Sequence, residues 1–142
     1  MADDRRIVYS VSVNPQEGIQ DENSNMHWIV DSDILTVLGG SNAVDINSTQ
    51  ETDWYKKGVQ LDSTGIYPNN DASDTIEFLF VKNNSAGSDN IFLSLDNKVT
   101  YPISIPPGEA FACRLNALTA DKIHIKSSAN IISSEYLLAK AE

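Results

Sequence analysis

The sequence is short of the residues that build disulfides and metal centres. Cys113 is the only cysteine among 142 residues, so no disulfide can form within the chain. Because Cys113 alternates with Phe111 and Leu115, we interpret it as a small buried hydrophobic residue and not as a reactive thiol. The two histidines, His27 and His124, lie far apart and belong to no H-x-H or H-E-x-x-H motif, which argues against zinc centres of those types.

Long apolar runs and the common catalytic motifs are also missing. No stretch approaches the ~20 apolar residues of a membrane-spanning helix, and the first residues, MADDRRIV, lack the apolar core of a signal peptide. The sequence contains neither G-x-S-x-G nor a phosphate-binding loop. We therefore expect a chain made and folded in a reducing cytoplasm, with no membrane partner, and we predict no catalytic residue, no cofactor and no metal.

Positive charge is scarce. The chain has 10 Lys and Arg against 20 Asp and Glu, a net charge of -10. Such a surface repels nucleic acid, so we expect no direct nucleic-acid partner. Residues 1–81 carry 14 acidic and four basic side chains, whereas residues 82–142 carry six of each. This imbalance fits either a solvated acidic surface or an acidic face that matches a basic protein partner.

What the sequence does have is a series of short alternating segments separated by Gly, Pro, Asn, Asp and Ser. We predict strands in the following segments: 6–13, two apolar runs within 27–38, 43–46, 75–81, 91–95, 99–105, 111–115, 122–126 and 131–139. The stretch DWYKKGVQL, residues 53–61, is expected to hold a helical turn followed by a strand. Such spacing is typical of an all-β fold, and we predict a jelly-roll-like β-sandwich of eight to ten short strands with little helix. We expect one domain over residues 1–142, with an N-terminal arm at 1–6 and a loop-rich region at 47–75.

Three details of this pattern make sharper predictions. Segment 75–81 has apolar residues on both faces, which is typical of a central strand. Gly39-Gly40 is expected to end the second apolar run of 27–38. His124 lies on the face opposite Ile123 and Ile125, so we expect a surface or interface histidine.

The stretch YPISIPPGEAFACRLN, residues 101–116, predicts a strand, a tight turn and a second strand. Pro107 suits the second position of a type II turn, and Gly108 supplies the positive φ that its third position needs. Pro102 cannot donate to a β-ladder, so we expect Tyr101 to Ile105 to form an edge strand or a bulged strand.

The order of segments over residues 75–142 resembles a known class of protein. The segments follow in this order: a strand ending in Lys-Asn-Asn, a small-residue loop, a strand ending in Leu-Asp, a strand reaching Ile-Pro-Pro-Gly-Glu, and a terminal pair of strands. This order is similar to that of small β-sandwich virion proteins of tailed bacteriophages, including capsid decoration and cement proteins. The resemblance implies a non-enzymatic role: binding the assembled major capsid protein and stabilising the shell from the virion surface, as a homo-oligomer with a trimer favoured.

Other functions stay open at this point. One is a different phage virion component, such as a head–tail connector, a tail protein or a fibre-associated protein. Another is a carbohydrate-binding β-sandwich that uses Trp28, Trp54 and Tyr55, because exposed aromatic rings can stack on sugars.

The candidate interface residues combine two cations with three aromatic rings. Trp54 and Tyr55 stand in a polar stretch where burial is not evident, and Tyr101 lies on the predicted edge strand. Arg5 and Arg6 are the only Lys or Arg residues before Lys56, so we expect them to pair with a partner. The acidic segments 31–33 and 69–77 are explained first by turn chemistry, with a weak surface calcium site as the alternative.

Overall fold

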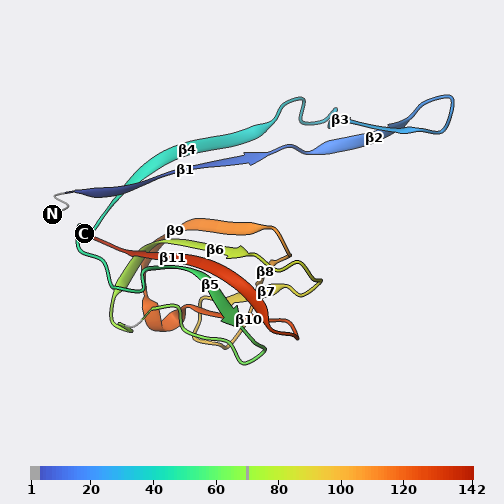
Figure 1. Ribbon diagram of the computed structural model, residues 1–142. Coiled ribbons are helices and arrows are strands. Elements are labelled where there is room, and N and C mark those ends of the chain that lie inside the picture. Colours follow the sequence, from blue (N-terminus) through green and yellow to red (C-terminus); the bar gives the residue numbers. More distant parts are fainter. Residues whose placement is uncertain (1–3, 70) are drawn as a thin grey trace. The chain divides into compact units, whose positions relative to one another are not determined.

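The computed structural model describes residues 4–69 and 71–142 (Figure 1). The chain divides into two compact units, one formed by Arg6–Val44 and one by Met1–Arg5 together with Asp45–Glu142. Among the described residues, the only helix is a single 3₁₀ turn at Ala120–Lys122, and no helix is long and apolar enough to cross a membrane. The all-β prediction is confirmed, although residues 4–69 and 71–142 form eleven strands and the pattern predicted eight to ten.

The larger unit is built from seven strands. They are β5 (Tyr55–Leu61), β6 (Thr75–Asn83), β7 (Ile91–Ser94), β8 (Ile103–Ile105), β9 (Ala110–Thr119), β10 (His124–Ser127) and β11 (Ile132–Lys140). Two antiparallel sheets result, one in the order β5-β11-β6-β9 and the other in the order β10-β7-β8. Strand β6 lies inside its sheet and β8 lies at an edge, as the sequence pattern predicted. The predicted strand was too long, because β8 begins at Ile103 and residues 99–102, Tyr101 among them, precede it.

The connectivity of these sheets is that of a jelly roll. An isolated antiparallel bridge between Ile66 and Ile125 adds a fourth member beside β10, so both layers have four members. Along the chain, the segments alternate between the layers except at the β7–β8 hairpin, which stays within one layer. Interleaving of this kind produces the two Greek keys of a jelly roll. The predicted sandwich is therefore confirmed, and it is completed by a segment that the alternation pattern did not identify.

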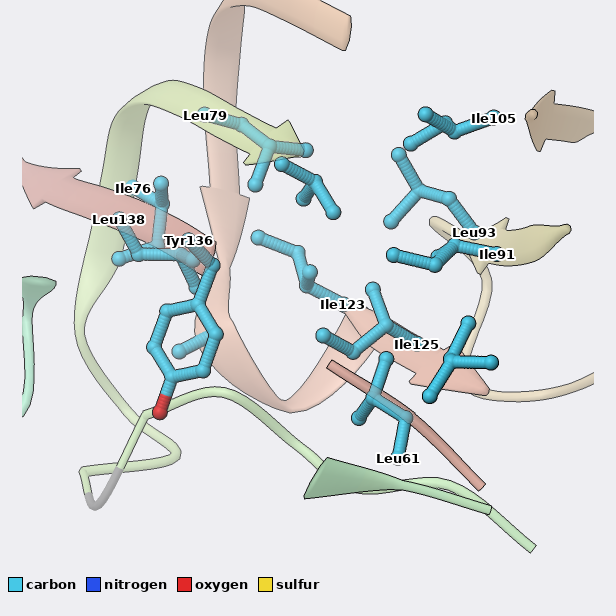
Figure 2. Packing of buried hydrophobic residues seen from close by; sticks show 13 residues of the cluster. Leu61, Ile76, Leu79, Ile91, Leu93, Ile105, Ile123, Ile125, Tyr136 and Leu138 are labelled. Carbon is cyan, nitrogen blue, oxygen red and sulfur yellow. The ribbon is translucent and has the colours of Figure 1, made fainter. Parts of the chain in front are cut away.

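The core of this unit lies between the two sheets. Figure 2 shows side chains from both sheets directed into a common interior, and the buried cluster consists of Leu61, Ile76, Leu79, Val81, Ile91, Leu93, Ile105, Ala120, Ile123, Ile125, Ile132, Tyr136 and Leu138. Burial of each large aliphatic side chain contributes roughly 1.5–3 kcal/mol. Phe111, Cys113 and Leu115 pack against this cluster from β9, so the predicted inward face of that strand is confirmed.

The turn at Pro106–Glu109 has the predicted geometry. Gly108 has a φ of +82°, and the amide of Glu109 donates to the carbonyl of Pro106 at 3.0 Å, which closes a four-residue turn. The amide of Gly108 also donates to the carbonyl of Asn83 at 2.8 Å. Because the turn is tied to β6 in this way, it fixes where β9 begins.

The smaller unit is a two-stranded ribbon. Strand β1 (Arg5–Val13) pairs with β4 (Leu38–Ile46), and β2 (Gln16–Gln20) pairs with β3 (Met26–Val30) in an antiparallel hairpin. The sequence pattern missed β2. It also ended the second apolar run at Gly39-Gly40, whereas β4 runs through both glycines. The reason is a close approach: a Cβ on Gly39 would lie 2.5 Å from the carbonyl oxygen of Val11, so only glycine fits there.

Residues 34–37 of the predicted second apolar run form part of a turn region and not a strand. The carbonyl of Asp31 accepts the amides of Ile34 and Leu35, and Leu35 has a φ of +69°. The carboxylate of Asp31 accepts the amide of Asp33 at 2.9 Å, which is the turn chemistry expected of segment 31–33.

Residues 1–3 of the predicted arm lie outside the described residues, and Arg5 and Arg6 are the first residues of β1. Among its described residues, the loop-rich region 47–75 contains β5, the bridge residue Ile66 and the first residue of β6, with turns and irregular segments between them. The prediction of a single domain over residues 1–142 stays a prediction.

Two glycines in the larger unit give a test of the turn and of the jelly-roll closure. Both have positive φ, +82° at Gly108 and +81° at Gly65, but a Cβ meets nothing at Gly108 and lies 2.3 Å from the carbonyl oxygen of Ile125 at Gly65. We expect Gly108→Ala to lower the free energy of unfolding by about 1 kcal/mol through backbone strain alone. Gly65→Ala should lower it by about 3 kcal/mol, because the clash adds to the strain. Urea unfolding of both variants measures the difference, and equal losses would contradict the close approach.

Candidate functional site

Exposed apolar side chains gather on the Arg6–Val44 ribbon. Of the fifteen exposed large hydrophobic residues among those described, eleven belong to this unit: Val8, Val11, Val13, Ile19, Met26, Trp28, Ile29, Ile34, Leu35, Val37 and Leu38. Trp28 is 64% exposed and Val8 is 71% exposed. Single exposed apolar residues are common on proteins, but such a concentration within one short unit makes the ribbon a candidate interaction surface.

The ribbon is also acidic. Residues 6–44 contain five carboxylates, those of Glu17, Asp21, Glu22, Asp31 and Asp33, against the guanidinium of Arg6, a net charge of -4. Asp21 organises the β2–β3 loop: its carboxylate accepts the amides of Asn23 and Asn25 and contacts His27 Nε2 at 2.9 Å. These hydrogen bonds, led by that of His27, lower the pKa of Asp21. Charged groups therefore accompany the apolar residues, an arrangement typical of protein interfaces with a polar rim.

The structure gives most of the predicted interface residues contacts within the chain. The guanidinium of Arg5 lies over the ring of half-buried Trp54, with 5.5 Å from Cζ to the ring centroid. Tyr55 is exposed and its hydroxyl donates to Glu135 Oε2 at 2.7 Å, which raises the pKa of Tyr55 and lowers that of Glu135. Arg6 is exposed. The interface role of these residues stays a prediction.

Tyr101, the remaining predicted interface residue, belongs to a network that sequence reasoning missed. Its hydroxyl lies 2.8 Å from His124 Nδ1, and the ring of Tyr67 meets the same imidazole edge-on with centroids 4.8 Å apart. His124 is only 3% exposed, so the expectation of a surface histidine is wrong. The alternation rule placed His124 correctly on the face opposite Ile123 and Ile125. It did not show that the two tyrosines cover that face.

Two ammonium groups lie against this network. Lys126 Nζ is 4.2 Å from the centroid of the Tyr101 ring, and Lys98 Nζ is 5.1 Å from that of Tyr67. Burial lowers the pKa of His124, and the positive charges of Lys98 and Lys126 lower it further. Desolvation raises the pKa of Tyr101. The ring of His124 is therefore held in its neutral form, as a packed and hydrogen-bonded part of the sandwich.

A second polar cluster is formed by Glu51, Asp71 and Asp74. Carboxylate oxygens of the three residues lie within 4.8 Å of one another, so they offer the ligand atoms that a cation would use. Lys140 Nζ lies 3.3 Å from Glu51 Oε1 and brings a positive charge to the cluster. Burial raises the pKa of Asp74, whose Oδ2 is buried without a hydrogen-bond partner. The side chain of Asn69 accepts the amide of Asp71, as turn chemistry predicted for this segment.

Cys113 is half-buried and packs against the core, as the sequence predicted. Burial raises the pKa of its thiol, which keeps the thiol protonated at neutral pH.

Comparison with known proteins identifies no relative: no family model matches the chain, and searches of curated proteins and of solved structures find no match.

The neutral imidazole of His124 leads to a pH prediction. A histidine whose pKa is lowered by folding binds fewer protons in the folded chain than in the unfolded chain. The stability it contributes is therefore complete above the ordinary histidine pKa of 6.5 and falls as pH drops below that value. We expect the free energy of unfolding to fall less between pH 7.5 and pH 5.5 in His124→Gln than in the original chain.

His27→Gln is the matched control, because His27 is exposed on the ribbon. Urea unfolding at several pH values measures the slopes, and an NMR titration of the imidazole signals assigns them. A His124 ring that titrates at or above 6.5 would contradict the buried network.

Proposed function

We propose that this chain is a non-enzymatic virion structural protein, a capsid decoration or cement protein that binds and stabilises the assembled major capsid protein shell. The observation that carries the proposal is the concentration of exposed apolar side chains on the Arg6–Val44 ribbon. The resemblance of residues 75–142 to phage virion β-sandwiches supplies the virion context. In this assignment, the jelly roll is the rigid body and the ribbon is the attachment element.

The physical argument rests on the architecture of the ribbon. A two-stranded β-ribbon has no second layer of its own, and such hairpins are marginally stable in water. Burial of its apolar side chains against a partner would contribute stability that the ribbon lacks by itself. A stable interface covers about 800 Å² on each partner. Eleven large apolar side chains along one ribbon are a suitable source of such an area.

The charge of the ribbon indicates which capsid surface it would meet. With a net charge of -4 it matches a surface that is apolar at its centre and basic at its rim. Binding should therefore weaken as salt rises, because the rim pairs are screened. A homotrimer would present three ribbons at once, and simultaneous attachment would strengthen binding without any new contact.

Cryo-electron microscopy of the source virion tests this proposal directly. Density for the jelly roll on the outer capsid surface, in hundreds of copies per particle, is the expected result. Density at a single vertex or along the tail, in about a dozen copies or fewer, would indicate a connector, tail or fibre-associated protein and would contradict the decoration role. Absence of the chain from purified particles would reject a virion function.

A pair of substitutions tests the ribbon itself. Trp28→Ala should weaken binding to the assembled shell by roughly 30-fold, since buried interface tryptophans commonly contribute about 2 kcal/mol or more. Val8→Ser should weaken it to a smaller extent, because less apolar area is lost. Sedimentation of each variant with preassembled shells measures the affinity.

Val99→Ser is the matched control, because Val99 is 78% exposed but belongs to the jelly roll. It should bind as the original chain does. Equal weakening by Val8→Ser and Val99→Ser would show that the ribbon is not the attachment element.

A further inference from the structure

A pocket opens on the jelly roll beside the His124 network. It is lined by Tyr67, Asn69, Ala72, Asn97, Ala120 and Asp121, and its volume is about 370 Å³. All of these residues belong to the larger unit. A volume of this size lies within the range of small-ligand sites, which are roughly 300–1,000 Å³. The lining combines one aromatic ring and two methyl groups with two amides and one carboxylate.

Several hydrogen bonds hold the loop that carries Asn97 in place. Asp96 Oδ1 accepts the hydroxyl of Ser94 at 2.8 Å and the amide of Thr100 at 2.9 Å, and Asp96 Oδ2 accepts the hydroxyl of Thr100 at 2.6 Å. These bonds, led by that of the Thr100 hydroxyl, lower the pKa of Asp96 to about 2. The amide of Asn97 donates to the carbonyl of Lys122 at 3.0 Å, which ties this loop to the 3₁₀ turn.

The same loop holds two consecutive residues in a strained conformation. Asn97 has a φ of +59° and Lys98 a φ of +69°. Side chains other than glycine reach this region at a cost, and it persists only where the surroundings enforce it. Here the Asp96 carboxylate holds Ser94 and Thr100, and Ser94 Oγ accepts the amide of Lys98 at 3.0 Å. Asn97, held in this loop, lines the pocket. Residues in such conformations occur in tight turns and also at ligand sites.

The ring of Tyr67 is fixed although 40% of the residue is exposed. Its hydroxyl donates to Asn97 Oδ1 at 2.5 Å, and its ring contacts the buried imidazole of His124 edge-on. A ring held in this way loses little further freedom when a ligand stacks on it, so the entropic cost of binding is small. The buried histidine thus acts as a support for an exposed aromatic surface.

We propose that this pocket binds a neutral sugar, as a free saccharide or as a residue of a glycan. A pyranose ring has an apolar C–H face and a rim of hydroxyl groups, and the pocket supplies a match for each. Tyr67 offers an aromatic surface for the C–H face. Asp121 holds the hydroxyl of Thr119 with Oδ1 and has Oδ2 to accept sugar hydroxyls, while Asn97 Nδ2 can donate to them.

The charge of the lining separates this ligand class from others. Asp121 carries the one formal charge in the lining, and Lys98 Nζ lies 5.1 Å from the centroid of the Tyr67 ring, so the pocket has no net positive charge that would favour an anionic ligand. Asp121 Oδ2 and Asn97 Nδ2 would find no hydrogen-bond partner in a purely apolar ligand, which disfavours such a ligand. A hydroxyl-rich neutral ring satisfies both conditions. This site also differs from Trp28, Trp54 and Tyr55, the residues that the sequence suggested for carbohydrate.

The experiment uses the isolated full-length protein, so its outcome is independent of capsid binding. Saturation-transfer difference NMR is recorded with glucose, galactose, mannose and N-acetylglucosamine in turn, and with a disaccharide of whichever sugar responds. We expect at least one of these sugars to bind with a dissociation constant of about 1 mM. Amide signals of Asn97 and Asp121 should shift in the ¹⁵N spectrum as that sugar is added. A stronger response to the disaccharide would indicate a glycan chain as the natural ligand, and an equal response a free sugar.

Variants localise the site. Tyr67→Ala should weaken binding at least tenfold, and Asp121→Asn, which preserves shape, should weaken it severalfold. Ile131→Ala is the control, since Ile131 is 69% exposed on the jelly roll and does not line the pocket, and it should leave binding unchanged.

The proposal is overturned if the folded original chain gives no saturation transfer with any of these sugars. It is also overturned if amide shifts occur only away from the pocket, or if Asp121→Asn and Tyr67→Ala bind as the original chain does. The amide shifts keep the test decisive even where Tyr67→Ala fails to fold.

Discussion

The pairing of β11 with both β5 and β6 is the interaction on which the jelly roll depends. Residues Ile132–Lys140 are the last strand of the chain, yet they lie inside the four-stranded sheet. Without β11, β5 would have no partner in that sheet, and β6 would keep only β9. The core between the sheets would lose Ile132, Tyr136 and Leu138 with it. The fold is therefore set by contacts between distant parts of the sequence, which are the slow and cooperative contacts of all-β folding.

The Arg6–Val44 ribbon has no second sheet of its own to cover its strands. In the jelly roll, a strand buries one face because a second sheet covers it. In Arg6–Val44 only two strands pair at any point, so alternation cannot hide the apolar residues within the unit. This is why regular strands such as β3 carry large exposed side chains, Trp28 among them. A ribbon of this composition requires a covering surface to be more than marginally stable, and that requirement is the physical basis of the proposed capsid attachment.

Sequence reasoning succeeded where one local rule decides the structure and failed where a distant contact decides it. Alternation located β6, β7, β10 and β11, and the chemistry of proline and glycine predicted the turn at Gly108. It failed at Gly39, because the need for glycine there comes from the carbonyl of Val11 on another strand. It also failed at His124, which is buried by Tyr67 and Tyr101 from outside its own strand. The Tyr67 pocket could not be predicted from the sequence for the same reason, because its lining comes from three separate segments of the chain.

The two proposed binding surfaces differ in the strength that their chemistry allows, and this difference lets them work together. An extended apolar interface can hold a partner for long times, because many side chains are buried at once. A pocket that accepts one sugar offers few atoms to bind, so its dissociation constant is about 1 mM and each contact is brief. Brief contacts become effective when many copies sit on one particle, since simultaneous weak attachments multiply affinity by roughly 10²–10⁴. A decorated shell would supply that repetition, and the sugar pocket of a single chain would then act only through assembly.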